Sequence, residues 1–188
     1  REGDLQFAES AITGNLKLLE GVVDSDPTNV KYLQLACMGY ASYALAFAEE
    51  DPSRAILFYT RARAYGVRGL ILRGIPRGAF TADGPTMKAA LGTLTASDVP
   101  LVFWTASAWG SAVSLQPNEP DAIASIPTAN AMMEWVLGRE PGFFYGGPSL
   151  YFGVYYGSFP PALGGKPALA KENFERARGA GRGKFLMT

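Results

Sequence analysis

Apolar residues along the chain recur at the three- to four-residue spacing of amphipathic helices, and long alternating, β-branched runs typical of strands are missing. Proline stands just inside several expected helix starts, where its missing N–H costs no hydrogen bond. The pattern predicts an all-α protein with helices at about 5–24, 28–49, 52–72, 85–94, 98–115, 120–139, 148–160 and 167–180. The terminal run Phe185-Leu186-Met187-Thr188 is expected to open another helix.

The segment that begins at Pro52 is repeated near the end of the chain. Small, aromatic and arginine positions coincide, because Pro52, Ala55, Tyr59, Arg61, Ala62, Arg63 and Gly66 return as Pro167, Ala170, Phe174, Arg176, Ala177, Arg178 and Gly181. A small residue, an aromatic residue one turn later and a second small residue are typical of the second helix of a tetratricopeptide unit. Such helix pairs stack to bury their apolar faces and leave a concave surface or channel.

We therefore predict tetratricopeptide-like stacked helix pairs in one domain, 1–188, in which two related units at about 16–66 and 131–181 are joined by central helices. Tyr59 and Phe174 are both expected to be buried beside an alanine of a partner helix.

Composition argues against catalysis. The chain has no histidine, which removes the commonest metal ligand and the usual general base of hydrolases. The lone Cys37 lies in an apolar run and is expected in the core. The carboxylates at Asp24/Asp26 and Glu49/Glu50/Asp51 stand at expected helix ends, where capping explains them. We therefore expect no catalytic residue, no metal and no cofactor.

Charge and hydropathy limit the possible partners. Lysine plus arginine number 17, as do aspartate plus glutamate, so no net field favours nucleic acid. The longest uncharged stretch, 141–165, is interrupted by prolines and glycines, which argues against a transmembrane helix. The chain opens on the polar Arg1-Glu2-Gly3-Asp4, so no secretory signal is expected there, which leaves the compartment open.

Two uncharged segments suggest a small-molecule site. In 99–118, Trp104 and Trp109 lie on different sides of the expected helix, so one can be core while the other faces a cavity. Near the end, Tyr151 and Tyr155 share a helical stripe that combines rings with hydroxyls, which suits a ligand cleft. The alternative is that these rings simply pack between helices. We predict a ligand cavity lined by helices 98–115 and 148–160.

Arginines between 52 and 82 stand without any acidic neighbour in that segment, and Arg54, Arg61 and Arg68 form one stripe at heptad spacing. The favoured interpretation is a solvated face. The alternative is a site for a carboxylate ligand or an acidic partner, with Arg61 or Arg68 at the mouth of the cavity.

Several linked strings resemble the T-component family associated with TRAP transporters, the tripartite ATP-independent periplasmic systems that import organic acids. They are Phe103-Trp104-Thr105-Ala106-Ser107-Ala108-Trp109-Gly110, Tyr145-Gly146-Gly147-Pro148, Pro160-Pro161-Ala162-Leu163-Gly164-Gly165 and Phe174-Glu175-Arg176-Ala177. The resemblance implies a periplasmic, usually lipid-anchored protein that partners the transporter's substrate-binding protein. The family's amino-terminal signal and anchoring cysteine are not in this sequence.

The sequence is compatible with three functions. The first is a non-catalytic accessory component of a TRAP-type solute importer that binds a periplasmic substrate-binding protein and a small organic acid or apolar ligand. The second is a generic tetratricopeptide-like scaffold for a peptide or protein. The third is a lyase or glycosidase of the helical-toroid kind, for which converging acids are missing. The apolar content of 143–159 also predicts a homo-oligomer.

Overall fold

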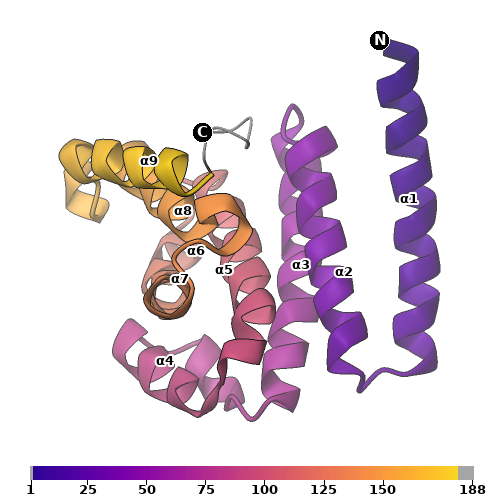
Figure 1. The fold of residues 1–188 in the computed structure, drawn as a ribbon, viewed down its shortest axis with the longest axis horizontal. Coiled ribbons are helices and arrows are strands. Elements are labelled where there is room, and N and C mark those ends of the chain that lie inside the picture. Colours follow the sequence, from indigo (N-terminus) through magenta and orange to yellow (C-terminus); the bar gives the residue numbers. More distant parts are fainter. Residues whose placement is uncertain (1, 182–188) are drawn as a thin grey trace.

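The computed structural model of the chain describes residues 2–181, and these residues form helices and connecting turns without any strand (Figure 1). The all-α prediction is confirmed. The expected helix opening at Phe185-Leu186-Met187-Thr188 lies outside the described residues.

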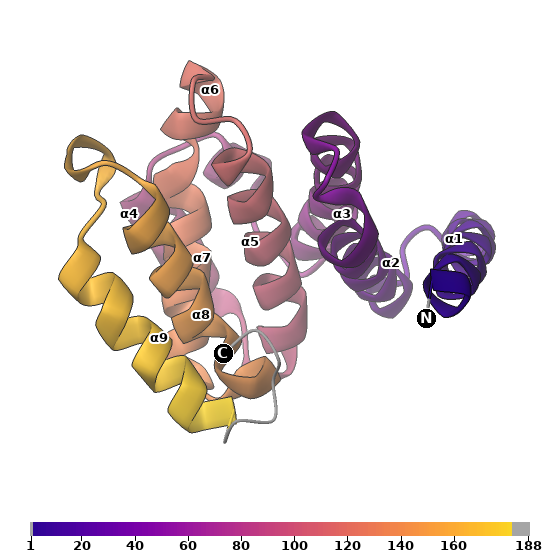
Figure 2. The same ribbon diagram turned by 90° about the horizontal axis from the view of Figure 1, so that it is seen from above.

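The amino-terminal helices stand side by side, each packed against the next. They are α1 (Glu2–Ser25), α2 (Val30–Tyr43), α3 (Pro52–Leu72) and α5 (Val99–Ser114), and α2 continues into a π-helical segment, η1 (Ala44–Ala48). Figure 2 shows this row from above, with α1 at its outer end.

The carboxy-terminal helices form a second group against α5. They are α7 (Ile126–Arg139), α8 (Phe143–Ser158) and α9 (Pro167–Gly181), preceded by the short α6 (Pro120–Ala124). The short α4 (Gly84–Ala90) packs on α7, and 3-10 turns lie at Arg77–Phe80, Leu91–Thr93, Ala96–Asp98 and Pro161–Leu163. The central helix α5 thus packs against α3 in its own group and against α7 and α8 in the second, which explains why it is apolar on nearly every side.

Helix starts follow the local sequence closely. Asn29 caps α2 by accepting hydrogen bonds from the backbone N–H groups of Lys31 and Tyr32. Asp51 caps α3 through the N–H of Arg54 in the same way, and Pro52 follows at the first helical position. These caps satisfy donors that the first helical turn leaves unpaired.

Four predicted helices differ from the observed ones. The helix expected at 85–94 ends at Ala90 and is followed by the 3-10 turn Leu91–Thr93. The helix expected at 28–49 changes to π geometry at Ala44, and the one expected at 120–139 breaks at Ser125, so that α6 and α7 are separate. Pro127 lies in the first turn of α7, a position where proline begins a helix and does not continue one. The helix expected at 148–160 begins earlier, at Phe143, with a left-handed turn through Phe144, Tyr145 and Gly146.

The two rings of the sequence repeat differ in burial. Tyr59 is 2% exposed, as predicted, but Phe174 is 41% exposed, so the prediction that it is buried is wrong. The reason is position: α3 lies between α2 and α5, whereas α9 packs mainly on α8 among the described residues. The flanking alanines, Ala55 and Ala62 in α3 and Ala170 and Ala177 in α9, are all buried.

Cys37 is fully buried on α2, as expected, and burial raises the pKa of its thiol to about 12. Within residues 2–181, no helix combines the length and apolar character needed to cross a membrane.

Candidate ligand cavity

A cavity of about 440 Å³ lies between α5 and α8, which places it within the size range of small-molecule sites. Its floor and walls are largely apolar and aromatic, and η1 and α9 add to its rim. The lining residues are Leu45, Glu49, Phe103, Trp104, Ser107, Gly110, Ser111, Val113, Ser114, Leu115, Ile126, Ala129, Phe144, Gly147, Leu150, Tyr151, Val154, Tyr155, Phe159 and Phe174.

One face of α5 supplies the polar part of the wall. Ser107, Ser111 and Ser114 follow one another at helical spacing, and each is half-buried. Gly110 lies on the same face and lets the Tyr151 ring approach, since a Cβ at this position would lie 2.4 Å from Tyr151 Cε2. The small residues of α5 therefore make room for rings from α8.

Tyr151 and Tyr155 line the cavity as the stripe on α8 suggested, but their hydroxyls are already engaged. Tyr151 donates to Asn130 Oδ1 at 2.9 Å, and Tyr155 donates to the carbonyl oxygen of Leu163 at 3.0 Å. Burial raises the pKa of Tyr151, so its hydroxyl stays neutral. These two residues contribute apolar ring surface to the cavity.

The two tryptophans of α5 occupy different environments. Trp104 lines the cavity and meets the Phe144 ring edge to face, at a centroid distance of 4.8 Å. Trp109 is not among the lining residues. Its indole Nε1 donates to Ser125 Oγ at 2.8 Å, and the Arg63 guanidinium lies 4.5 Å from its ring centroid. Trp109 is therefore a packing residue between α3, α5 and α6.

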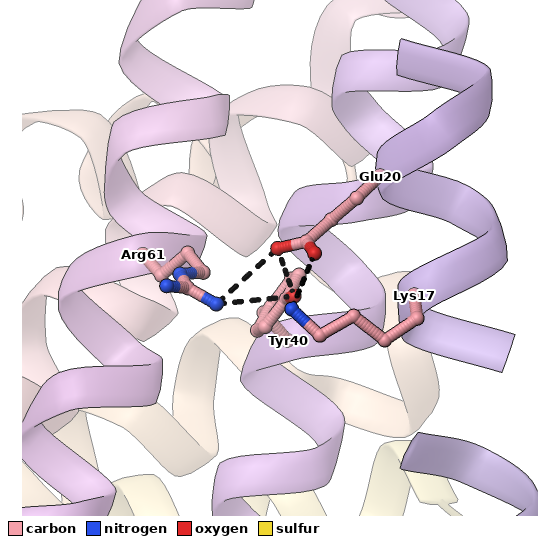
Figure 3. Close-up of polar contacts among 4 residues, drawn as sticks. All are labelled: Lys17, Glu20, Tyr40 and Arg61. Atoms are coloured by element: carbon pink, nitrogen blue, oxygen red, sulfur yellow. Dashed lines mark hydrogen bonds and ion pairs between the residues drawn. The ribbon is translucent and has the colours of Figure 1, made fainter. Parts of the chain in front are cut away.

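Arg61 and Arg68 do not reach the cavity. Figure 3 shows Arg61 turned toward α1, where its Nη1 lies 3.2 Å from Glu20 Oε1 and 3.4 Å from the Tyr40 hydroxyl. Lys17 pairs with the same carboxylate at 2.7 Å. Arg68 donates to the carbonyl oxygen of Pro27 in the α1–α2 connection.

The arginine stripe on α3 is thus an internal docking surface. Arg54, at its other end, pairs with Glu9 of α1 and also donates to the Tyr43 hydroxyl. Sequence reasoning overlooked Glu9 and Glu20 as its partners. The spacing of Glu9 and Glu20 could have indicated this role, because it places both carboxylates on similar sides of α1.

Electrostatics at the Glu20 cluster agree with this role. Hydrogen bonds from Lys17 and then Tyr40 hold the pKa of Glu20 below its ordinary value. Burial, followed by the hydrogen bond to Glu20, raises the pKa of Tyr40 to about 12. The cluster therefore holds one ionised carboxylate and one neutral phenol at neutral pH.

Glu49 is the charged residue that sequence reasoning missed at the cavity. It follows η1 directly, lines the cavity and accepts a hydrogen bond of 2.6 Å from the Tyr59 hydroxyl. Burial and then this hydrogen bond raise the pKa of Tyr59 well above its ordinary value. The capping interpretation is correct for Asp51 but does not describe Glu49.

Four apolar side chains at the cavity are between 38% and 44% exposed, namely Leu45, Phe144, Val154 and Phe174. Phe144 projects from a turn in which it has φ 45° and Tyr145 has φ 59°, the left-handed region that bulky residues rarely adopt. Gly153 lets Phe174 approach α8, since an added Cβ would lie 2.8 Å from that ring. We call these four residues the apolar rim.

Within the described part of the chain, no group of three or more cysteine, aspartate or glutamate side chains is placed to hold a metal ion.

These features define an all-helical protein of serially packed helices with an apolar cavity beside its central helix. The chain belongs to the TRAP transporter T-component family, whose model matches residues 1–188. The family resemblance found in the sequence is confirmed, and the protein is accordingly an accessory component of TRAP transport, of a family expected outside the cytoplasm. No curated protein matches the chain significantly.

Proposed function

We propose that this protein is a non-catalytic accessory component of a TRAP-type importer that holds a small, largely apolar organic ligand in the cavity between α5 and α8. The main observation that supports this proposal is the cavity itself. Its volume suits a small molecule, and its wall combines the rings of Trp104, Tyr151 and Tyr155 with a few serine hydroxyls. Apolar walls with a small number of polar groups are the usual make-up of such sites.

The partner in this proposal is the periplasmic substrate-binding protein of the same transporter, and the full-length protein is lipid-anchored in the periplasm. Membership of the T-component family supports both points. The apolar rim offers surface that association would remove from water, because exposed apolar clusters commonly mark interaction sites.

Partner binding is tested by surface plasmon resonance between this protein and the purified substrate-binding protein of the same TRAP system. We expect saturable binding that weakens at least severalfold in Val154→Glu, which places a charge in the rim. Val67→Glu on α3, a partly buried position away from the rim, serves as the control for general damage.

Saturable binding that Val154→Glu leaves unchanged would place the partner on another face. Absence of any binding would contradict the partnership, and saturable binding of unrelated extended peptides in its place would favour the general scaffold.

A further inference from the structure

The π-helical segment η1 positions two of the side chains that line the cavity. Across Ala44–Ala48 the helix carries wider turns than an α-helix, and such segments often occur at functional sites. Leu45 within it and Glu49 directly after it both line the cavity, whereas Ala44 and Ala48 are buried in the core. The segment thus presents one apolar and one acidic side chain to the cavity.

Among the described residues that line this cavity, Glu49 alone has a charged side chain. The Tyr59 hydroxyl holds its Oε1 at 2.6 Å, which fixes the carboxylate but leaves Oε2 for another donor. Among the described residues, no lysine or arginine forms an ion pair with Glu49.

Four arginines of α3 are engaged by other groups and do not line the cavity. Arg54 and Arg61 are paired with carboxylates of α1, Arg68 donates to the α1–α2 connection, and Arg63 lies against Trp109. An anionic ligand would therefore meet the Glu49 carboxylate and no lysine or arginine among the described residues that line the cavity.

We propose that the cavity selects amphiphiles with a cationic amine head, which Glu49 binds while the apolar body occupies the space between α5 and α8, and that it discriminates against carboxylates. This inference rests on the proposed function, since it names the ligand class of the same cavity. An amine donates to the free oxygen of Glu49 and neutralises its charge, whereas a ligand carboxylate is repelled. Glu49 is exposed, and water and salt weaken ion pairs at exposed groups, so the expected preference is at most about fivefold in affinity.

The test compares dodecylamine, dodecanol and dodecanoate, each below its micellar concentration, as competitors of the neutral dye Nile red. The three share one alkyl chain and differ in the head group. We expect wild-type protein to bind the amine about fivefold more tightly than the alcohol, and the alcohol more tightly than the carboxylate. Glu49→Gln should reduce the differences among the three to about twofold.

Glu50→Gln is the matched control, because it removes the neighbouring exposed carboxylate, which does not line the cavity. It should keep the wild-type order. The inference is overturned if all three compounds bind wild-type protein equally, or if both variants change the order to the same extent. Either result would leave unaffected the proposal that the apolar cavity binds a ligand. Failure of every compound and of Nile red to bind overturns the inference together with the ligand-binding function.

Discussion

At the scale of single residues, Gly66 lies where α3 packs closely against both α2 and α5. A Cβ at this position would lie 2.1 Å from Thr105 Oγ1 and 3.0 Å from Cys37 Sγ. Thr105 is held in place because its hydroxyl donates to the Leu101 carbonyl oxygen at 2.6 Å. The site has no space for a methyl group unless Thr105, Cys37 or one of the helices moves.

Gly66→Ala should therefore destabilise the protein by about 1–3 kcal/mol, the usual cost of overpacking a core, despite the better helix propensity of alanine. Urea unfolding measures this free energy. Gly21→Ala is the control, since an added Cβ there meets nothing within 4 Å, and it should stabilise slightly. Equal stability of the two variants would show that the three helices are less closely packed than described.

At the same scale, the cavity residues show what sequence can and cannot reveal. Trp104, Tyr151 and Tyr155 were found because uncharged aromatic helices imply an internal position. Trp109 does not line the cavity, and the sequence could not distinguish it from Trp104, since helical spacing separates two sides of α5 but does not say which side meets another helix. Glu49 was missed because its role depends on the π turn and on α5, which lies far from it in sequence.

At the scale of elements, α1 is held against its neighbours by polar as well as apolar contacts. Leu16 and Val23 are buried on its inner face, but Phe7 and Leu18 are 77% and 71% exposed. Its carboxylates Glu9 and Glu20 bind the α3 arginines and the α2 tyrosines. Loss of these contacts should loosen α1 while the other helices remain folded.

The pH dependence of this docking follows from the lowered pKa of Glu20. A carboxylate with a lowered folded-state pKa contributes stability above its unfolded value, and this contribution is lost as pH falls through the folded pKa. Glu20→Gln should therefore lower the free energy of unfolding at pH 7, and its difference from wild type should shrink below about pH 4.

Urea titrations across this pH range give the comparison, with Asp24→Asn of the same helix as the control for a carboxylate outside the cluster. A wild-type advantage over Glu20→Gln that grows on acidification would contradict this role of Glu20.

Most helix boundaries were predictable because capping side chains and proline act locally, as Asp51 and Pro52 show at α3. The break at Ser125 and the left-handed turn at Phe144 were not, because such backbone geometry is stabilised by packing against distant helices. The arginine stripe was recognised as a surface, but its partners lie on a helix that only tertiary structure brings alongside.

At the scale of the whole molecule, the apolar rim and the exposed face of α1 leave Phe7, Leu18, Leu45 and Phe174 in contact with solvent. We predict a homo-oligomer that covers part of this surface, because large apolar patches usually mark interfaces. Sedimentation velocity at micromolar concentration should show a species larger than the 20.1 kDa chain. Val154→Glu should shift it toward monomer, and a wild-type protein that sediments only as monomer would contradict the prediction.

The central claim is that the space between α5 and α8 is a ligand site, and occupancy of that space tests it most directly. Nile red titration should give saturable binding to wild-type protein and a loss of at least tenfold in affinity for Ser107→Phe, which fills the cavity from α5. Ser53→Phe adds the same ring at an exposed position of α3 and should leave binding unchanged. Equal binding by folded wild-type and Ser107→Phe proteins would contradict the claim.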